Sequence, residues 1–156
     1  MNKTKLTHLT WDDIEDCCRK LASAIKNSDF KPETIVGIQR GGCITAVLLS
    51  HLLNIENFCT IGIRSTKSDD IRAQRIKPII YDSFSLQLIT GKKVLLADDI
   101  TDTGETLIEA KKELLKYGPK EVKSATIICA PASNGKVDFY GKEVKPWVVF
   151  PWENKI

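Results

Sequence analysis

The stretch Val94–Leu107, VLLADDITDTGETL, decides the fold that the sequence predicts. It opens with consecutive aliphatic residues, a pattern typical of a strand buried on both faces of a parallel sheet. Acidic and polar residues follow, and then apolar residues at helical spacing. We therefore predict a strand over 92–97 and a helix over 103–117. The residues expected on the inward face of that helix are Leu107, Ile108, Ala110, Leu114 and Leu115.

The turn between this strand and helix has the chemistry of an anion site. Amide groups at the start of a helix lack partners and carry partial positive charge, so they attract a phosphate. Thr103 and Thr106 add hydroxyl donors, and Gly104 permits close approach of the backbone. Asp98 and Asp99 would repel a phosphate at contact distance, so we expect them to face sugar hydroxyls or a magnesium ion.

A plainer interpretation is that these residues only cap the helix and line a solvated turn. Capping itself needs few polar side chains. Residues 98–107 contain four acids and three threonines, which is more than capping requires. The segment is no P-loop, because the chain lacks both G-x-x-x-x-G-K-[ST] and G-x-G-x-x-G. We therefore favour a site for a sugar phosphate.

Strands and helices alternate along the rest of the chain, which predicts an α/β fold with a parallel sheet and helices on both faces. Thr10 and Asp13 fit a capping box at the start of the first helix, and the second strand ends in the turn Gln39–Gly42. The polar stretch 65–77 is expected to be a mobile loop, and 78–88 a hairpin or excursion. The remaining elements are expected as helices over 11–27 and 43–53 and strands over 34–38, 58–64 and 124–129.

Length and composition bound the class of protein. The 156 residues predict one domain over 1–156. The net charge of +3 is too slight to imply a nucleic-acid or membrane partner. Five cysteines without a C-x-x-C pair indicate reduced, mostly buried thiols. No apolar stretch has the length of a signal peptide or a membrane span, so we expect a soluble cytoplasmic protein.

The order of strand, two acids and D-T-G-x-T turn resembles the phosphoribosyl-diphosphate motif of type I phosphoribosyltransferases. Three further segments, Thr10–Asp12, Ile38–Gly42 and Pro151–Glu153, resemble bacterial xanthine-guanine phosphoribosyltransferases at corresponding places. The resemblance covers most of the chain. It implies the type I phosphoribosyltransferase fold, with a central mostly parallel sheet, flanking helices and a mobile active-site loop.

The resemblance also implies which residues bind substrate. Asp98 and Asp99 would hold the ribose hydroxyls and magnesium, with Asp99 as the metal ligand, while Asp102 would lie near the imidazole nitrogen of the purine. Arg40 and Gly41 would bind diphosphate, since a guanidinium offers a charged fork to phosphate oxygens. The turn that would wrap the 5′-phosphate consists of Ile100, Thr101, Asp102, Thr103, Gly104, Glu105 and Thr106.

Two outlying segments complete the implied site. Arg72 matches a diphosphate-binding arginine in the mobile loop, with Lys67 and Arg75 as rivals for that role. Trp147 and Val148 match residues that contact the base, although core or interface packing explains them equally well. Asp102, Arg72 and Arg40 are the residues expected to act in catalysis.

One position departs from the similar enzymes. Ala130 stands where they carry a lysine that donates to the 6-oxo group of the purine. Leaving that carbonyl without a donor costs about 1–3 kcal/mol. Lys136, Lys123 or a water replaces the lysine, or the base is a different one.

The resemblance thus implies a magnesium-dependent phosphoribosyltransferase of nucleotide salvage. It would transfer the phosphoribosyl group to hypoxanthine, guanine or xanthine and would release diphosphate. The alternatives are a non-catalytic regulator of the same fold that senses phosphoribosyl diphosphate, and an enzyme for another nucleobase. The resemblance further implies a homo-oligomer, a dimer or a tetramer.

Overall fold

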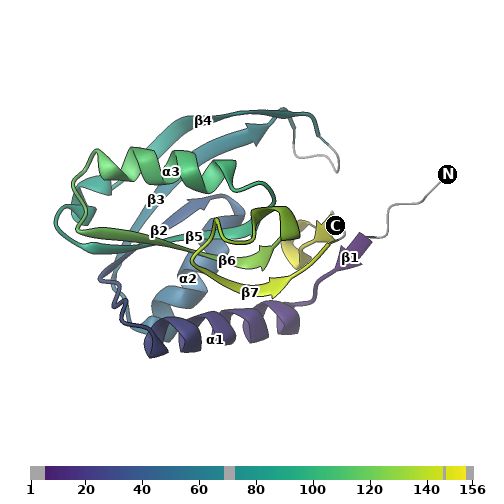
Figure 1. The fold of residues 1–156 in the computed structure, drawn as a ribbon, viewed down its shortest axis with the longest axis horizontal. Coiled ribbons are helices and arrows are strands. Elements are labelled where there is room, and N and C mark those ends of the chain that lie inside the picture. The colour runs from purple at the N-terminus through teal and green to yellow at the C-terminus, as the bar shows by residue number, and fades with distance from the viewer. Residues whose placement is uncertain (1–5, 69–72, 146, 154–156) are drawn as a thin grey trace.

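A six-stranded sheet forms the centre of the computed structural model, which describes residues 6–68, 73–145 and 147–153 (Figure 1). The strand order is β4-β3-β2-β5-β6-β7, and every neighbouring pair is parallel except β3 and β4. The strands are β2 (Thr34–Gln39), β3 (Asn57–Thr66), β4 (Arg75–Phe84), β5 (Lys93–Thr101), β6 (Glu121–Cys129) and β7 (Phe139–Glu143).

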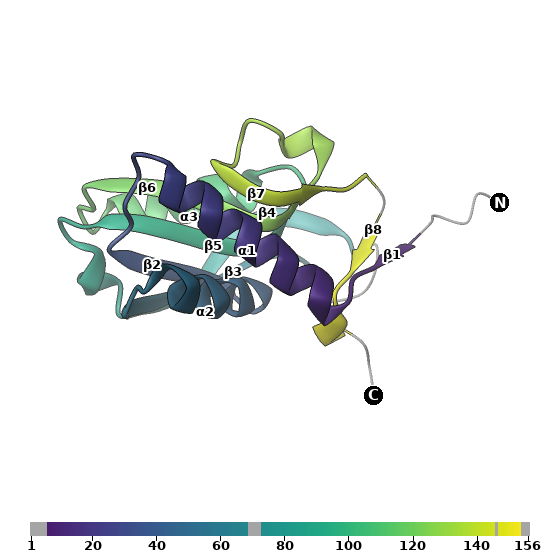
Figure 2. The same cartoon turned by 90° about the horizontal axis from the view of Figure 1, so that it is seen from below.

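The helices cover both faces of this sheet, as the alternation of elements predicts. Helices α1 (Trp11–Asn27) and α2 (Gly41–Leu53) lie on one face, and α3 (Glu105–Leu115) lies on the other (Figures 1 and 2). Consecutive apolar residues of β5 serve both sides: Leu95 belongs to the core under α1 and α2, and Leu96 belongs to the core under α3. This double burial explains why β5 reads as an unbroken apolar run.

Local signals in the sequence set the helix ends. The Thr10 hydroxyl accepts from the Asp13 N–H at 3.2 Å, and the Asp13 carboxylate accepts from the Thr10 N–H at 2.8 Å, so the capping box is present. Asn54 ends α2 in the left-handed conformation. Helix α3 is shorter than the predicted span 103–117, because Gly104 with φ +84° breaks the helical backbone before it.

Two parts of the sequence-based description of these elements were wrong. Ile108 and Leu115, expected to face inward, are 45% and 59% exposed, because α3 packs on the sheet through a narrow stripe of Leu107, Ala110 and Leu114. The predicted loop 65–77 is also shorter, since β3 runs to Thr66 and β4 starts at Arg75. The excursion over 78–88 consists of most of β4 and a 3-10 turn, Leu86–Ile89.

A second, two-stranded sheet joins the two described ends of the chain. Strand β1 (Leu6–His8) pairs in parallel with β8 (Trp147–Val149). A 3-10 turn, Pro151–Glu153, follows β8, and its Trp152 ring lies 5.8 Å from Trp11 at the start of α1. This small sheet lies at the end of the molecule where β5 and β6 finish (Figures 1 and 2).

Two simpler expectations concern thiols and membrane segments. All five cysteines are free, and four of them are buried. In the described part of the chain, no helix is both long and apolar enough to cross a membrane.

Candidate active site

The acids after the central strand lie at the carboxyl edge of the sheet. Asp98 is 8% exposed and Asp99 is half-buried. The Asp98 carboxylate accepts from the Asp99 N–H at 2.9 Å, and the Asp99 carboxylate accepts from the Ile100 N–H at 2.8 Å. Among the described residues, no lysine or arginine forms an ion pair with either carboxylate. Two neighbouring carboxyl groups thus lie side by side, with no ion-pair partner in the part of the chain that the structure describes.

This environment shifts the acidity of both groups. Burial, which disfavours the charged form, and the neighbouring Asp99 charge raise the pKa of Asp98 well above its usual range. Burial raises the pKa of Asp99 to about 6, and the charge of Glu153 adds to the shift. A pair of carboxylates held in this way favours a ligand that brings positive charge or hydroxyl donors.

The R-G-G turn touches these acids directly. A Cβ at Gly41 would overlap the Asp99 carboxylate, and a Cβ at Gly42 would lie 2.6 Å from the Ala97 carbonyl oxygen. Because the contact at Gly42 is with backbone, only a glycine there allows α2 to approach β5 this closely. Arg40, which precedes them, is exposed, and the Gln39–Arg40 peptide bond is cis. The structure thus brings Arg40 and Gly41 to the same edge as Asp98 and Asp99.

The expected phosphate turn follows the acids without a break. Ile100 and Thr101 end β5, and residues 102–104 form a turn that leads into α3. Gly104 precedes Glu105, the first residue of α3, and Thr106 lies in its first turn. The turn therefore presents the amide groups of a helix start beside two carboxylates, and of these the Glu105 N–H donates to the Thr103 hydroxyl at 3.5 Å.

An arginine from β4 closes over this turn. Arg75 Nη2 lies 2.5 Å from Asp102 Oδ2, and Arg75 Nη1 donates to the Thr103 hydroxyl at 3.0 Å. Of the candidates Lys67 and Arg75, both within the described residues, Arg75 is therefore the one whose side chain contacts the turn. Lys67 donates its backbone N–H to the Gln74 carbonyl at 3.0 Å. Arg72, expected to bind diphosphate, lies outside the described residues.

The residues expected to contact the base lie on β8. The Trp147 side chain is 47% exposed, and Val148 packs against the core under α1 and α2. The 3-10 turn after β8 brings Glu153 within electrostatic range of Asp99. Trp147 and Val148 therefore lie at the same end of the molecule as the acids.

The lysines considered as substitutes at Ala130 have different positions. Lys123 lies near the amino end of β6, with its ammonium 5.4 Å from the centre of the Phe30 ring. It is therefore remote from the carboxyl edge of the sheet. Lys136 lies at that edge, and its ammonium donates to the Thr103 carbonyl at 2.8 Å. The Lys136 ammonium therefore contacts the turn 102–104, which is expected to bind the 5′-phosphate.

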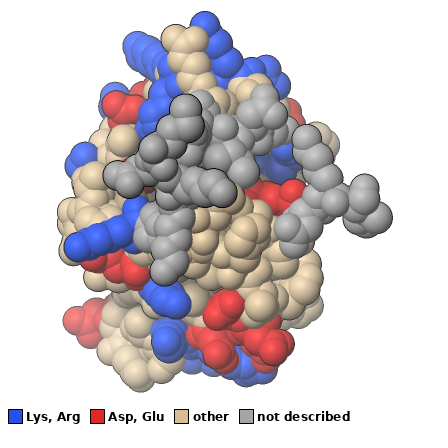
Figure 3. Space-filling model, turned by 90° about the vertical axis from the view of Figure 1, so that its right-hand side faces the viewer, with Lys and Arg blue, Asp and Glu red and all other residues tan. Residues whose placement is uncertain are grey.

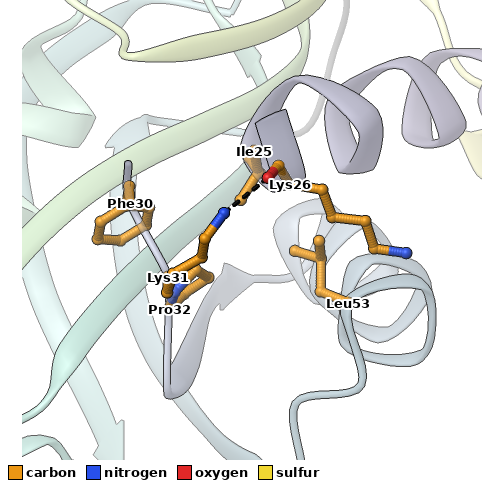
Figure 4. A pocket seen from close by; sticks show the side chains of 6 residues that line it. All are labelled: Ile25, Lys26, Phe30, Lys31, Pro32 and Leu53. Carbon is orange, nitrogen blue, oxygen red and sulfur yellow. Dashed lines mark hydrogen bonds between the residues drawn. The ribbon is translucent and has the colours of Figure 1, made fainter. Parts of the chain in front are cut away.

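Two cavities elsewhere in the molecule are not lined by the paired acids or the turn after β5. A cavity of about 160 Å³ lies at the amino edge of the sheet, where the Lys31 ammonium caps the Lys26 carbonyl (Figure 4). A larger one, about 580 Å³, is a mainly apolar groove between α1 and α2. Figure 3 shows this end of the molecule, with basic side chains gathered at the top and acidic and basic side chains intermixed at the bottom.

A metal ion would have few protein ligands in this site. In the ranges that the structure describes, no group of three or more His, Cys, Asp or Glu side chains is arranged to hold a metal. Magnesium is commonly bound by one or two carboxylates together with substrate phosphates. The carboxylates of Asp98 and Asp99, which have no ion-pair partner among the described residues, fit a magnesium ion bound together with a phosphate-bearing ligand.

Sequence reasoning assigned no role at the turn to Lys136 or Ser133, and it named Arg75 only as a rival. Lys136 and Ser133 lie in the loop after β6, which contacts the turn after β5. No short-range pattern signals such a contact, because it depends on the pairing of β5 and β6. The basic residues in the loop 65–77 were a signal for Arg75, but three of them competed.

Comparison with known proteins agrees with this geometry. A family model described as "Phosphoribosyl transferase domain" matches residues 9–156. The xanthine-guanine phosphoribosyltransferase of Cereibacter sphaeroides is 31% identical, over 94% of this chain and 86% of that protein. The enzyme of the same name from Chromohalobacter salexigens is 33% identical, over 93% and 82%.

Solved structures give the same result. The purine phosphoribosyltransferase from Pyrococcus horikoshii Ot3 superposes with a TM-score of 0.81 at 33% identity, over 97% of this chain and 95% of that one. A Helicobacter pylori xanthine-guanine-hypoxanthine phosphoribosyltransferase shares the fold, with a TM-score of 0.76 at 22% identity. Fold, motif and similarity over nearly the whole length agree, and the chain belongs to the phosphoribosyltransferase family.

Proposed function

We propose that this protein transfers the phosphoribosyl group from phosphoribosyl diphosphate to a purine base in nucleotide salvage. The C1–O bond to diphosphate breaks, and diphosphate leaves with its electron pair. A ring nitrogen of the base bonds to C1, and the proton of that nitrogen leaves. The observation that carries the proposal is the contact of the R-G-G turn with Asp99, which joins a diphosphate loop to a ribose-binding carboxylate.

The residues of the site divide this work by position. The amide groups and hydroxyls of the turn bind the 5′-phosphate, and the Asp98 and Asp99 carboxylates accept from the ribose hydroxyls. Arg40 and Gly41 bind diphosphate, where a guanidinium stabilises the charge that develops as the bond breaks. Asp102 accepts or orients the proton of the base nitrogen. Arg72 is proposed as a second diphosphate ligand.

Magnesium belongs to this proposal as the ion bound with the substrate. Asp99 would hold it, with Asp98 beside it, because neither carboxylate has an ion-pair partner among the described residues and oxygen ligands suit the ion. When bound, it neutralises charge on the leaving diphosphate.

Trp147 and Val148 are proposed to contact the base from β8. At Ala130 the methyl side chain offers no donor to a 6-oxo group, and the Ala130 N–H already donates to the Thr101 carbonyl at 2.8 Å. Lys123 is too far down β6 to serve, and Lys136 is engaged at the turn. We propose that a water, held at this edge of the site, donates to the purine in place of the lysine.

A panel of bases tests the proposed reaction. The enzyme is incubated with phosphoribosyl diphosphate, magnesium and one of hypoxanthine, guanine, xanthine, adenine or uracil, and release of diphosphate is measured. We expect turnover with one or more of the three 6-oxopurines. Turnover with adenine or uracil alone would overturn the base assignment.

The same samples distinguish the enzyme from a sensor of the same fold. Calorimetric binding of phosphoribosyl diphosphate with no release of diphosphate for any base would indicate a regulator. Absence of binding would overturn the proposed substrate itself.

The remaining expectations on partners stay proposals. We propose a homo-oligomer, dimer or tetramer, in the cytoplasm, with no nucleic-acid partner. Light scattering after size exclusion measures the mass of the particle, and a mass of 17.5 kDa would mean a monomer.

A further inference from the structure

The loop after β6 contacts two backbone carbonyls, one at the last residue of β5 and one in the turn that follows. The Lys136 ammonium donates to the Thr103 carbonyl at 2.8 Å. The Thr101 carbonyl accepts from the Ala130 N–H at 2.8 Å, and the Ser133 hydroxyl lies 2.9 Å from both the Thr101 and the Ala130 carbonyl oxygens. Ser133 is fully buried, and its own N–H donates to the Ala130 carbonyl at 2.9 Å, so the loop is itself fixed in place.

Holding a carbonyl fixes the direction of the next amide. A peptide unit is planar, and in the trans form its C=O and N–H point in opposite directions. The carbonyl of Thr103 shares its peptide plane with the N–H of Gly104, and that of Thr101 shares its plane with the N–H of Asp102. Neither N–H donates to an acceptor among the described residues. Both donors therefore point away from the loop after β6.

The stem of Lys136 reinforces this arrangement. A Cβ at Gly104 would lie 2.7 Å from Lys136 Cδ and 3.0 Å from Lys136 Cβ, so the side chain packs directly on the glycine backbone. Gly104 has φ +84°, which other residues rarely adopt. Lys136 thus covers one side of the turn, and the free amides face the other.

We propose that Lys136 is a positioning residue for the phosphate end of the substrate. By holding the Thr103 carbonyl it presets the Gly104 N–H as a donor to a phosphate monoester, and Ser133 does the same for the Asp102 N–H through Thr101. The inference rests on the proposed function, because it assigns the 5′-phosphate to this turn. It concerns binding of the phosphate, and leaves the chemistry at C1 unaffected.

Binding of ribose 5-phosphate tests the role, because this probe carries the phosphate without diphosphate or base. Lys136→Met keeps much of the apolar stem and removes the donor. We expect its Kd by calorimetry to rise roughly tenfold, the value of a charge-assisted hydrogen bond. Lys136→Arg should restore most of the affinity. Lys112→Met on α3 removes a positive charge at an exposed place and should bind as the parent protein does.

A neutral variant separates orientation from charge. Ser133→Ala removes a hydroxyl and no charge, and we expect its Kd for ribose 5-phosphate to rise about threefold. In turnover, Lys136→Met should raise KM for phosphoribosyl diphosphate, with kcat and KM for the base within about twofold of the parent protein. A purely structural defect would lower the melting temperature and would affect all of these constants together.

Two outcomes overturn the inference in different ways. Parent-like affinity of Lys136→Met for ribose 5-phosphate would remove the positioning role and leave the proposed function intact. The same follows if only Lys136→Met, and not Ser133→Ala, weakens binding, since charge alone would then explain it. A parent protein that binds neither ribose 5-phosphate nor phosphoribosyl diphosphate would overturn the proposed function, and this inference with it.

Discussion

Single glycines decide whether the two loops of the site can meet. A Cβ at Gly42 would lie 2.6 Å from the backbone oxygen of Ala97, which cannot move without shifting β5. We expect Gly42→Ala to lower the free energy of unfolding by about 2 kcal/mol, the usual cost of overpacking. Urea unfolding followed by circular dichroism measures this change.

The neighbouring glycine makes a matched comparison. The three atoms nearest to a Cβ at Gly41 all belong to the side chain of Asp99, which can rotate away. Gly41→Ala should therefore unfold like the parent protein, while its affinity for phosphoribosyl diphosphate falls at least roughly tenfold because Asp99 is displaced. Equal losses of stability in the two variants would contradict this distinction.

The buried acids set a dependence of stability on pH. Because the pKa of Asp99 is raised from 3.8 to about 6, the native state binds more protons than the unfolded state between these values. The contribution of Asp99 to the free energy of unfolding should therefore be most favourable below pH 3.8 and should fall as the pH rises towards 6. Above that range its contribution is constant and unfavourable.

Asp99→Asn tests this assignment, because an amide carries no charge to bury. We expect the variant to lose activity and yet to gain about 1 kcal/mol at pH 7, which raises Tm by roughly 2–4 °C. Differential scanning calorimetry at pH 5 and pH 7 measures the gain, which should shrink at the lower pH. Asp16 has an exposed side chain on α1, so Asp16→Asn is the control and should change neither the activity nor Tm. A fall in Tm would show that the carboxylate stabilises the fold.

At the scale of elements, β4 contributes to the site through its first residue. Arg75 bonds both Asp102 and Thr103, and the Arg75 and Asp102 side chains are about half exposed. An exposed ion pair adds little stability, so Arg75→Ala should change the free energy of unfolding by less than about 0.5 kcal/mol. We expect kcat/KM for phosphoribosyl diphosphate to fall roughly tenfold, because two contacts to the turn are lost.

Arg64→Ala provides the matched control, since that arginine lies on β3 and packs over the Tyr81 ring. Steady-state kinetics should separate the two variants. Equal kcat/KM values in Arg75→Ala and the parent protein would leave the loop arginine without a role in substrate binding.

The elements that could be predicted from the sequence are those with strong local signals. The capping box at Thr10 and the helical spacing after it predicted α1 to the residue, and the unbroken apolar runs predicted β2 and β5. Both strands were longer than predicted, because pairing with neighbours carries β5 past Ala97 to Thr101. The acids therefore lie within the last part of a strand.

Elements that depend on distant partners were missed. Strands β1 and β8 have three residues each and form only because they pair across the whole chain, and β7 is a short edge strand. The hydrogen bond from the Lys136 ammonium to the Thr103 carbonyl depends on the pairing of β5 with β6. The motif thus predicted the acids and the turn, while the side chains that would orient them required the tertiary structure.

At the scale of the whole molecule, we expect one cooperative unfolding transition. Both hydrophobic cores share the central sheet, and the sheet of β1 and β8 ties the tail to the start of α1 through the Trp11 and Trp152 rings. Tryptophan fluorescence, which reports on this end, and far-ultraviolet circular dichroism should give the same midpoint. An earlier fluorescence transition would show that the small sheet unfolds by itself.

The parallel pairing of β1 with β8 has a practical consequence for engineering. Because the pairing is parallel, the start of the described chain at Leu6 lies beside Trp147, the start of β8, and the described chain ends a few residues later at Glu153. A short linker could connect these points in a circular permutant, with new ends opened at the Gly118 turn on the opposite side. An affinity tag attached there would leave the approach to the substrates clear.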